Sequence, residues 1–397
     1  MLVLLYELSI DIFMLDGLSI LKIVVTVFLW LSVGISINQF FKNYKKLSNS
    51  IPQRAFYILC LLIIWNLINI GRSLYIETGQ IITLFGNINT SLALLLPFLI
   101  VFSIKIANLK KINSYFFTLI KIGIILFILF FVFSGGVLNI VHITILNAFF
   151  LPVIFLITTF RFEKNSKKLI ILIVTFLLAY VAYIYGSRTM IIRLLLLIIG
   201  LIPLYLYRKF HFKWVLKGTF ILILLPFILI QYSINTGESA IQKYTSGVSS
   251  GSEMSQDTRT FLYLEVYEDL AENKQLLFGK GAGGTYYSNY FNTASGDSDS
   301  RLTVEVGVLA ILLKTGLIGV ILYLLLIFAS IFYAFFRSNN YYVVGIGLML
   351  FIYVLLLFIE NAISYSGNSL FIWFFIGVCL SKEIRNMSNL EIKFILN

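Results

Sequence analysis

Long apolar runs joined by short polar connections constrain the fold of this chain more than any other feature. A hydrocarbon core about 30 Å thick is crossed by about 20 consecutive apolar residues in a helix, because every backbone polar group must be paired within the segment. Of the 397 residues, 59% are hydrophobic and only 12% are charged. The sequence therefore predicts an all-α, polytopic integral membrane protein.

About eleven segments are long enough to span a bilayer. They cover residues 18–41, 55–73, 82–104, 115–134, 142–160, 169–186, 190–207, 217–233, 316–336, 341–361 and 369–383. The opening stretch 1–16 is short and contains Glu7 and Asp11, so it either lies on the membrane surface or forms a twelfth span. The chain then divides into transmembrane helices over 1–233, a polar loop over 234–303, and C-terminal transmembrane helices with a short tail over 304–397.

Lysine and arginine mark one side of the membrane, because cytoplasmic loops are enriched in these residues. The basic connections lie at 42–54, 105–111, 161–168, 208–217, 337 and 382–393. The opposite connections carry little basic charge, so the large loop is predicted to be periplasmic or extracellular. The formal net charge of +12 then reflects topology and contact with anionic lipid, and no binding to nucleic acid is expected.

Few residues are suited to metal or disulfide chemistry. Cys60 and Cys379 both fall within predicted spans; His142 lies at an outer helix end and His211 in a cytoplasmic loop, on opposite sides of the membrane. Neither a disulfide framework nor a set of zinc ligands can be assembled from them. The sequence therefore predicts no zinc site.

Three arginines lie near predicted outer helix ends. Arg188 occupies the tight turn 185–190, where charge at the membrane surface is costly and often functional, although an arginine bonded to lipid phosphate explains it equally well. Arg193 is a candidate substrate-binding residue; it follows about 140° further round the helix, so it need not share a face with Arg188. Arg72 flanks another outer turn, where hydrogen bonding between helices or snorkelling is the simpler explanation.

The large loop contains a predicted amphipathic helix. Asp257 suits an N-cap, and apolar residues recur at positions 261, 264, 267 and 271. Arg259 falls in the first turn, where the helix dipole disfavours a cation unless an anion is also bound. Beside free helix amides, Arg259 could bind a phosphate; a simple surface arginine is the alternative.

A glycine-rich bend follows this helix, with glycines at 279, 281, 283 and 284. No βαβ context surrounds it, so a dinucleotide-binding loop is not predicted. Gly281 and Gly283, with Lys280 between the glycines, would let the backbone approach a sugar or a phosphate. Tyr286 offers an apolar face with a polar tip, which suits a pyranose ring and equally suits the membrane interface.

Arg301 and Glu305 precede an apolar run to Phe336 that is too long for one upright span. We expect a shallow or re-entrant helix, a break at 316–319, and then a full span. Glu305 would be partly buried at the outer interface, where a carboxylate with a raised pKa is a candidate general base. Ion pairing with Arg301 or Arg259 is the alternative, and the two roles are compatible.

Together these motifs resemble the superfamily of O-antigen polymerases (Wzy-type) and O-antigen ligases, over residues 170–335. The series comprises Gly186-Ser-Arg-Thr-Met190 at an outer turn, Arg259 at the beginning of a loop helix, Leu277-Phe-Gly-Lys-Gly-Ala-Gly283, and Glu305 ahead of Gly316-Leu-Ile-Gly319. The resemblance implies a GT-C-like, metal-independent glycosyltransferase in the bacterial cytoplasmic membrane. It also implies that undecaprenyl-pyrophosphate-linked oligosaccharides are the substrates and that Arg188 and Arg259 hold the pyrophosphate.

Ligases of this superfamily typically place a histidine where this chain has Glu305. That departure favours a polymerase of O-antigen, capsule or exopolysaccharide, with Glu305 as the base of an inverting transfer. A chain-length regulator and a flippase are the implied protein partners. The alternatives are an O-antigen ligase, a lipid-linked oligosaccharide flippase or transporter, for which so large an outer loop is unexpected, and a non-enzymatic assembly protein.

Overall fold

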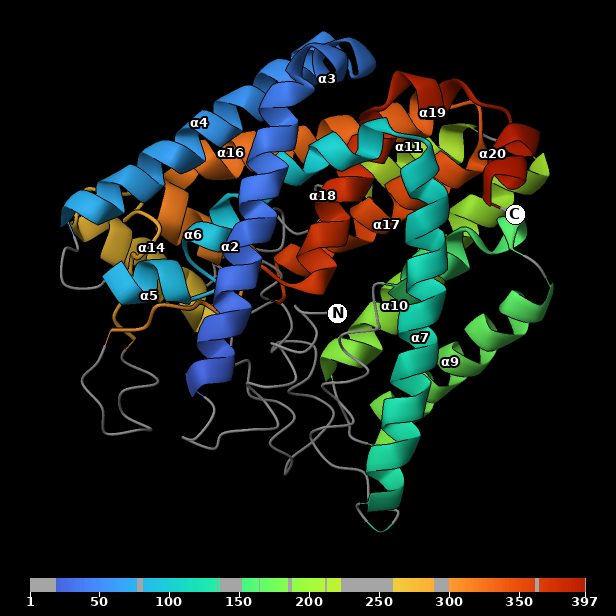
Figure 1. Cartoon of the computed structure of the whole chain (residues 1–397), viewed down its shortest axis with the longest axis horizontal. Coiled ribbons are helices and arrows are strands. Elements are labelled where there is room, and N and C mark those ends of the chain that lie inside the picture. Colours follow the sequence, from blue (N-terminus) through green and yellow to red (C-terminus); the bar gives the residue numbers. More distant parts are fainter. Residues whose placement is uncertain are drawn as a thin grey trace.

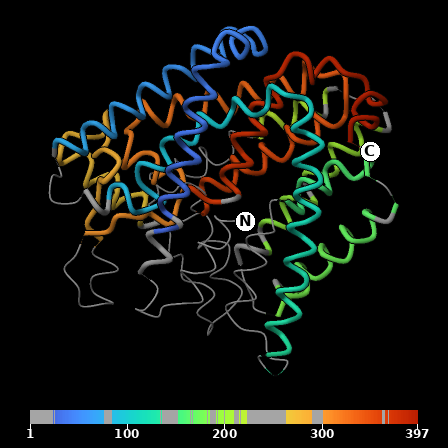
Figure 2. The backbone as a smooth tube through the Cα atoms, viewed as in Figure 1, coloured from blue at the N-terminus to red at the C-terminus, as the bar shows by residue number. Residues whose placement is uncertain are grey.

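A computed structural model describes residues 19–76, 81–133, 135, 152–163, 165–184, 188–210, 213–222, 260–288, 300–360 and 364–396. Within these residues the regular structure is helical, and one isolated antiparallel bridge pairs Tyr286 with Arg301. Arg188 begins a helix, but its side chain is not described, and Arg259 lies outside the described residues. The helices form a bundle in which α4, from the first quarter of the chain, lies against α16, from the last quarter (Figures 1 and 2).

The helices up to the glycine-rich bend are α2 (Ser19–Lys42), α3 (Tyr44–Ser50), α4 (Gln53–Ile76), α5 (Ile81–Gly86), α6 (Ser91–Leu94), η3 (Leu96–Ile104), α7 (Ala107–Phe133), η4 (Phe160–Phe162), α9 (Asn165–Ile184), α10 (Arg188–Phe210), α11 (Lys213–Ile221) and α14 (Thr260–Glu272). After the bend come α16 (Gly307–Phe336), α17 (Tyr341–Leu357), α18 (Gly367–Leu380), α19 (Lys382–Asn386) and α20 (Asn389–Leu396).

Three of these helices are long and apolar enough to cross a membrane: Gln53–Tyr75, Ala107–Phe133 and Gly307–Phe336. Large apolar side chains are exposed along them and along α2 and α9, for example Leu31 at 56% and Phe176 at 79%. Exposed apolar faces of this extent are expected where lipid replaces water. The chain is therefore a helical membrane protein, while the count of eleven or twelve spans, the GT-C-like arrangement and the outer location of the loop stay predictions.

The centre of the bundle is formed by α16, α17 and α18, with η3 and α4 packed against them. Aromatic rings pack along α18, where Phe155 stacks on Phe375 at 4.8 Å and Phe116 lies 4.3 Å from Phe371. Offset and tilted ring pairs at these separations are favourable beyond the area they bury. This core fixes the position of α16, which supports the site described below.

The prediction of one continuous span over 82–104 is wrong, because α5, α6 and η3 are separate pieces. The Thr90 hydroxyl lies 2.7 Å from the carbonyl oxygens of both Leu84 and Asn87, and the Asn66 amide donates to the Leu94 carbonyl at 2.8 Å. These side chains satisfy backbone groups that a continuous helix would have paired internally. Irregular backbone is tolerated at membrane depth where it is buried in protein in this way.

The break predicted at 316–319 is confirmed at its first residue. Gly316 has φ +67° and ψ −173° within α16, so the helix bends there and its backbone pairing is interrupted. Only glycine adopts this conformation without steric cost. The segments on either side are both helical, as expected for an apolar run too long for one upright span.

The C-terminal tail folds back onto the bundle as α19 and α20. The Asn340 amide donates to the carbonyl oxygens of Ile384 at 2.8 Å and Met387 at 3.0 Å, and its own oxygen caps α17 by accepting from Val343 N–H. Ile392 on α20 is fully buried. The tail is thus part of the fold, held by a side chain that is 2% exposed.

Candidate functional site

Several helix ends meet in the first part of the candidate site, which we call the helix-end junction and define by Arg193, Tyr263, Glu305, Gly307 and Glu360. The Gly307 N–H at the beginning of α16 donates to the Glu360 carbonyl at 2.9 Å, just beyond the end of α17. The Tyr263 hydroxyl on α14 donates to the Phe358 carbonyl at 2.7 Å. The loop helix is thereby fixed against the same helix ends as the predicted base.

A bidentate ion pair forms the centre of the junction. Arg193 on α10 donates from Nε to Glu360 Oε1 at 2.9 Å and from Nη2 to Glu360 Oε2 at 2.6 Å. The two side chains are only 16% and 10% exposed. The sequence analysis placed Arg193 among the substrate-binding residues and did not identify Glu360. The available signal was a single acid at the end of an otherwise apolar run, which in a membrane segment indicates a partner.

The expectation that Glu305 is partly buried is wrong. Its side chain is 44% exposed, and its nearest carboxylate oxygen lies 3.9 Å from Arg301 Nη2. The backbone is extended just before α16, so side chains alternate: Val304 and Val306 are buried, and Glu305 points away from the core. Glu305 is therefore accessible to a substrate, with Arg301 as its near cation.

The glycine bend, residues 276–284, supplies the hydrogen bonds that α16 loses at Gly316. Lys280 N–H donates to the Leu313 carbonyl at 2.7 Å, and Gly281 N–H donates to the Lys314 carbonyl at 3.0 Å. In the other direction, Leu317 N–H donates to the Leu276 carbonyl at 3.0 Å. The backbones of the bend and of α16 are in direct contact here. A Cβ at Gly316 would overlap the backbone of the bend, and a Cβ at Gly279 would overlap the backbone of α16. This close approach accounts for both glycines.

The bend is also clamped by α4. Arg72 donates to the carbonyl oxygens of Phe278 at 2.8 Å and Gly279 at 3.0 Å, and the Gly283 N–H donates to the Ser73 hydroxyl at 3.2 Å. A Cβ at Gly281 would overlap Ser73 Oγ. The structure thus uses Arg72, Gly281 and Gly283 to hold the bend in place. We expected the two glycines to approach a sugar or a phosphate, whereas hydrogen bonding within the protein was already the simpler explanation for Arg72. The bend is held in this way because a broken helix in an apolar bundle needs paired backbone groups.

Two other predicted contact residues are similarly engaged with the protein. Lys280 Nζ lies 2.6 Å from Asp269 Oδ2 on α14, which ties the bend to the loop helix. Tyr286 is 1% exposed, so its ring is closed to a sugar in this conformation, and burial raises the pKa of its phenol. Its neighbour Tyr287 is 51% exposed and presents the accessible aromatic face.

One candidate residue escaped the sequence analysis altogether. Lys314 lies on α16 two residues before the break and is 3% exposed. Within the described residues, its ammonium group has no hydrogen-bond or ion-pair partner. An ionisable side chain among apolar helices is a functional candidate by default, because its desolvation is costly. The signal was a single lysine in the apolar run that ends at Phe336.

The remaining predictions concern residues that the structure does not place in full. Arg188 begins α10, so its backbone lies about 7.5 Å along the helix from Arg193. Arg259 directly precedes α14 in the sequence. Among the described residues, no three His, Cys, Asp or Glu side chains are grouped so as to hold a metal ion. Metal-independent chemistry stays a prediction.

No curated protein and no solved structure matches the chain. A family model described as O-antigen ligase matches residues 173–324. This segment contains α10, α14, the glycine bend and the first half of α16, and therefore most of the residues described above. Over these residues the chain is similar to the O-antigen ligase family, in agreement with the resemblance that the sequence motifs carry over residues 170–335.

Proposed function

We propose that this membrane protein transfers a lipid-linked glycan onto a second lipid-linked repeat unit and so polymerises a surface polysaccharide. The observation that carries the proposal is the family match, because residues 173–324 contain the break in α16, the glycine bend and most of the residues that define the helix-end junction. The substrates would be oligosaccharides on undecaprenyl pyrophosphate, used at the outer face of the bacterial cytoplasmic membrane.

The chemistry follows from where charge develops during such a transfer. An acceptor hydroxyl attacks the anomeric carbon with inversion, the bond to pyrophosphate breaks, and negative charge accumulates on the leaving phosphate. We assign Arg188 and Arg259 to that phosphate. Glu305 would accept the proton from the attacking hydroxyl, and its 44% exposure leaves it within reach of a substrate. No step requires a cofactor, since the glycosyl–pyrophosphate bond supplies the energy.

The ligase function is the second candidate, and the match to a family described as O-antigen ligase favours it. The presence of Glu305 in place of a histidine favours the polymerase. A polymerase would act beside a flippase that delivers repeat units and a regulator that limits chain length. Both partners are proposals that follow from the function.

A gel of surface polysaccharide tests the proposal. In a strain lacking this gene, we expect single repeat units on the lipid anchor and no ladder, and wild-type protein should restore the ladder. Arg188→Ala and Arg259→Ala should not restore it, because removing one donor to developing charge costs about a hundredfold in rate or more. Arg54→Ala, an exposed arginine at the beginning of α4, is the matched control and should behave as wild type.

The same gel separates the two candidate functions. Long polymer that accumulates on undecaprenyl pyrophosphate in the deletion strain, with nothing on the final acceptor, would identify a ligase. Ladders of normal length from both arginine variants would remove these residues from the site. Each variant must first elute as folded protein in detergent at wild-type yield.

Lys314 gives a prediction in which stability and activity change in opposite directions. Lys314→Met removes an ammonium group that is 3% exposed, so the unfolding temperature in detergent should be unchanged or higher. If Lys314 holds a phosphate of the substrate, the polysaccharide ladder should nevertheless be lost. Lys217→Met, at an exposed position on α11, is the control and should change neither quantity. A normal ladder from Lys314→Met would exclude this role.

A further inference from the structure

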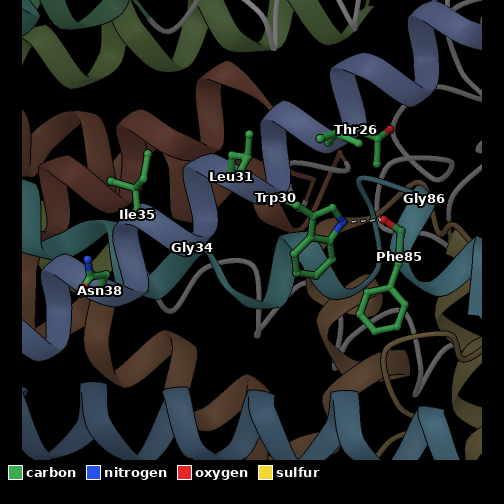
Figure 3. Close-up of a pocket in the computed structure, with 9 residues that line it drawn as sticks. Thr26, Trp30, Leu31, Gly34, Ile35, Asn38, Phe85 and Gly86 are labelled. Carbon is green, nitrogen blue, oxygen red and sulfur yellow. Dashed lines mark hydrogen bonds between the residues drawn. The ribbon is translucent and has the colours of Figure 1, made fainter.

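A groove runs along one face of α2, and none of the residues of the helix-end junction lines it (Figure 3). It has a volume of about 650 Å3 and lies between α2 and α5, which are joined by a hydrogen bond of 2.8 Å from Trp30 Nε1 to the Phe85 carbonyl. Its other lining residues follow the helical repeat on α2: Thr26, Val27, Leu31, Gly34, Ile35 and Asn38. The walls are almost entirely apolar.

The middle of the groove is open because of a glycine. No heavy atom lies within 4 Å of the position that a Cβ would take at Gly34. Beside it, Leu31 is 56% exposed and Ile35 is 58% exposed. A side chain at Gly34 would therefore fill space that the protein leaves empty.

At one end the groove adjoins a polar, basic hollow. Ile35 also lines a second hollow of about 240 Å3, whose polar lining residues are Gln39, Asn43, Lys46, Lys105 and Asn108. No acidic side chain lines it. Lys46 and Lys105 are exposed, and neither has an ion pair within the described residues. An apolar groove thus leads directly into a hollow with two cations and three amide side chains.

We infer that this groove and hollow bind an anionic phospholipid of the cytoplasmic leaflet, with one acyl chain along α2 and the phosphate at Lys46 and Lys105. The apolar part from Thr26 to Asn38 extends about 18 Å along the helix. One leaflet of hydrocarbon is about 15 Å deep, so the groove matches a single acyl chain. Basic hollows between helices on the cytoplasmic side suit phosphate headgroups.

The sidedness of the basic residues decides between lipid occupants. Lys46 and Lys105 belong to the basic connections that face the cytoplasm by the distribution of positive charge. The proposed transfer uses lipid pyrophosphates at the opposite face, so its substrates would present their phosphates at the wrong end of this groove. The inference does not depend on the proposed transfer, because it needs only membrane insertion in that orientation.

Native mass spectrometry of the purified, delipidated full chain tests the site with phosphatidylglycerol and phosphatidylcholine as probes. Wild type should retain phosphatidylglycerol in preference. Each basic residue near the surface contributes about fivefold to binding of anionic lipid, so Lys46→Ala with Lys105→Ala should weaken phosphatidylglycerol binding roughly 25-fold. The control pair Lys110→Ala with Lys111→Ala removes the same charge from exposed positions on α7 and should have little effect.

Gly34→Leu should reduce binding of phosphatidylglycerol by filling the groove, without a clash inside the protein. Gly218→Leu on α11, where the Cβ position is equally open, should bind phosphatidylglycerol as wild type does.

Equal retention of both lipids by wild type, or undiminished phosphatidylglycerol binding by the Lys46 and Lys105 double variant, would overturn the inference. Displacement of phosphatidylglycerol by equimolar undecaprenyl phosphate would also overturn it, in favour of a prenyl phosphate. If Gly34→Leu does not fold, the two lysine pairs still decide the question.

Discussion

Gly316→Ala is expected to abolish recovery of folded protein from detergent extracts. At φ +67° and ψ −173°, a region essentially restricted to glycine, an alanine costs about 1–3 kcal/mol in backbone strain alone. In addition, its Cβ would overlap the Leu277 carbonyl and push the glycine bend off α16. The backbone hydrogen bonds between the bend and α16 would then break, and each buried group left unpaired costs about 1–3 kcal/mol.

The measurement is size-exclusion chromatography of the detergent extract, followed by thermal unfolding of any monodisperse fraction. Gly279→Ala should have a similar effect, since its Cβ would overlap the backbone around Gly316. Gly71→Ala on α4 is the matched control: no heavy atom lies within 4 Å of its Cβ position, so stability should be unchanged or slightly higher. If Gly316→Ala were recovered as folded protein at the wild-type yield, the close contact between the glycine bend and α16 would be contradicted.

Glu360→Leu is expected to lower stability by about 3 kcal/mol or more, because the Arg193 guanidinium loses its bidentate carboxylate at a largely buried position. The Glu360 carbonyl that caps the beginning of α16 is a backbone group and remains. The lost stability should therefore come from the unpaired charge on Arg193, and the backbone contacts of the junction should persist. Thermal unfolding in detergent measures it.

The double variant Arg193→Leu with Glu360→Leu separates these causes. Replacing a buried ion pair by apolar side chains is often close to neutral, so most of the lost stability should return. Glu383→Gln on α19 changes an exposed acid and should leave the unfolding temperature unchanged. A double variant that is as unstable as Glu360→Leu alone would mean that packing, and not an uncompensated charge, sets the cost. In that case the pair is not the organising feature of the junction.

Local patterns in the sequence identified the features that depend on local physics. The apolar runs predicted membrane helices because backbone groups in lipid must be paired within the same segment. The break near Gly316 was predictable because the run to Phe336 is too long for one upright span and glycine tolerates the conformation. The failure over 82–104 has the opposite cause: Asn66, which lies 28 residues from its partner Leu94, stabilises an interruption that hydropathy does not reveal.

Partners far apart in the sequence could not be deduced from single residues. Arg193 and Glu360 are separated by 167 positions, and Arg72 and Phe278 by 206. The sequence indicated only that both arginines lie near helix ends in apolar surroundings, where a charge is costly. Nothing local indicated that a carboxylate or a carbonyl of the same chain would pair with them in place of a substrate.

The sequence by itself determined the class of the molecule, the helix break and the resemblance to a superfamily of sugar-transfer proteins, because hydropathy, glycine conformation and motif order are properties of short segments. Only the tertiary structure decided which charged groups are engaged. Folding commits Arg72, Arg193 and Lys280 to protein partners, since a charge or a broken backbone in an apolar bundle must be paired. It leaves Glu305 exposed and buries Lys314 among the helices, because the extended backbone before α16 alternates its side chains while the helix itself lies within the bundle.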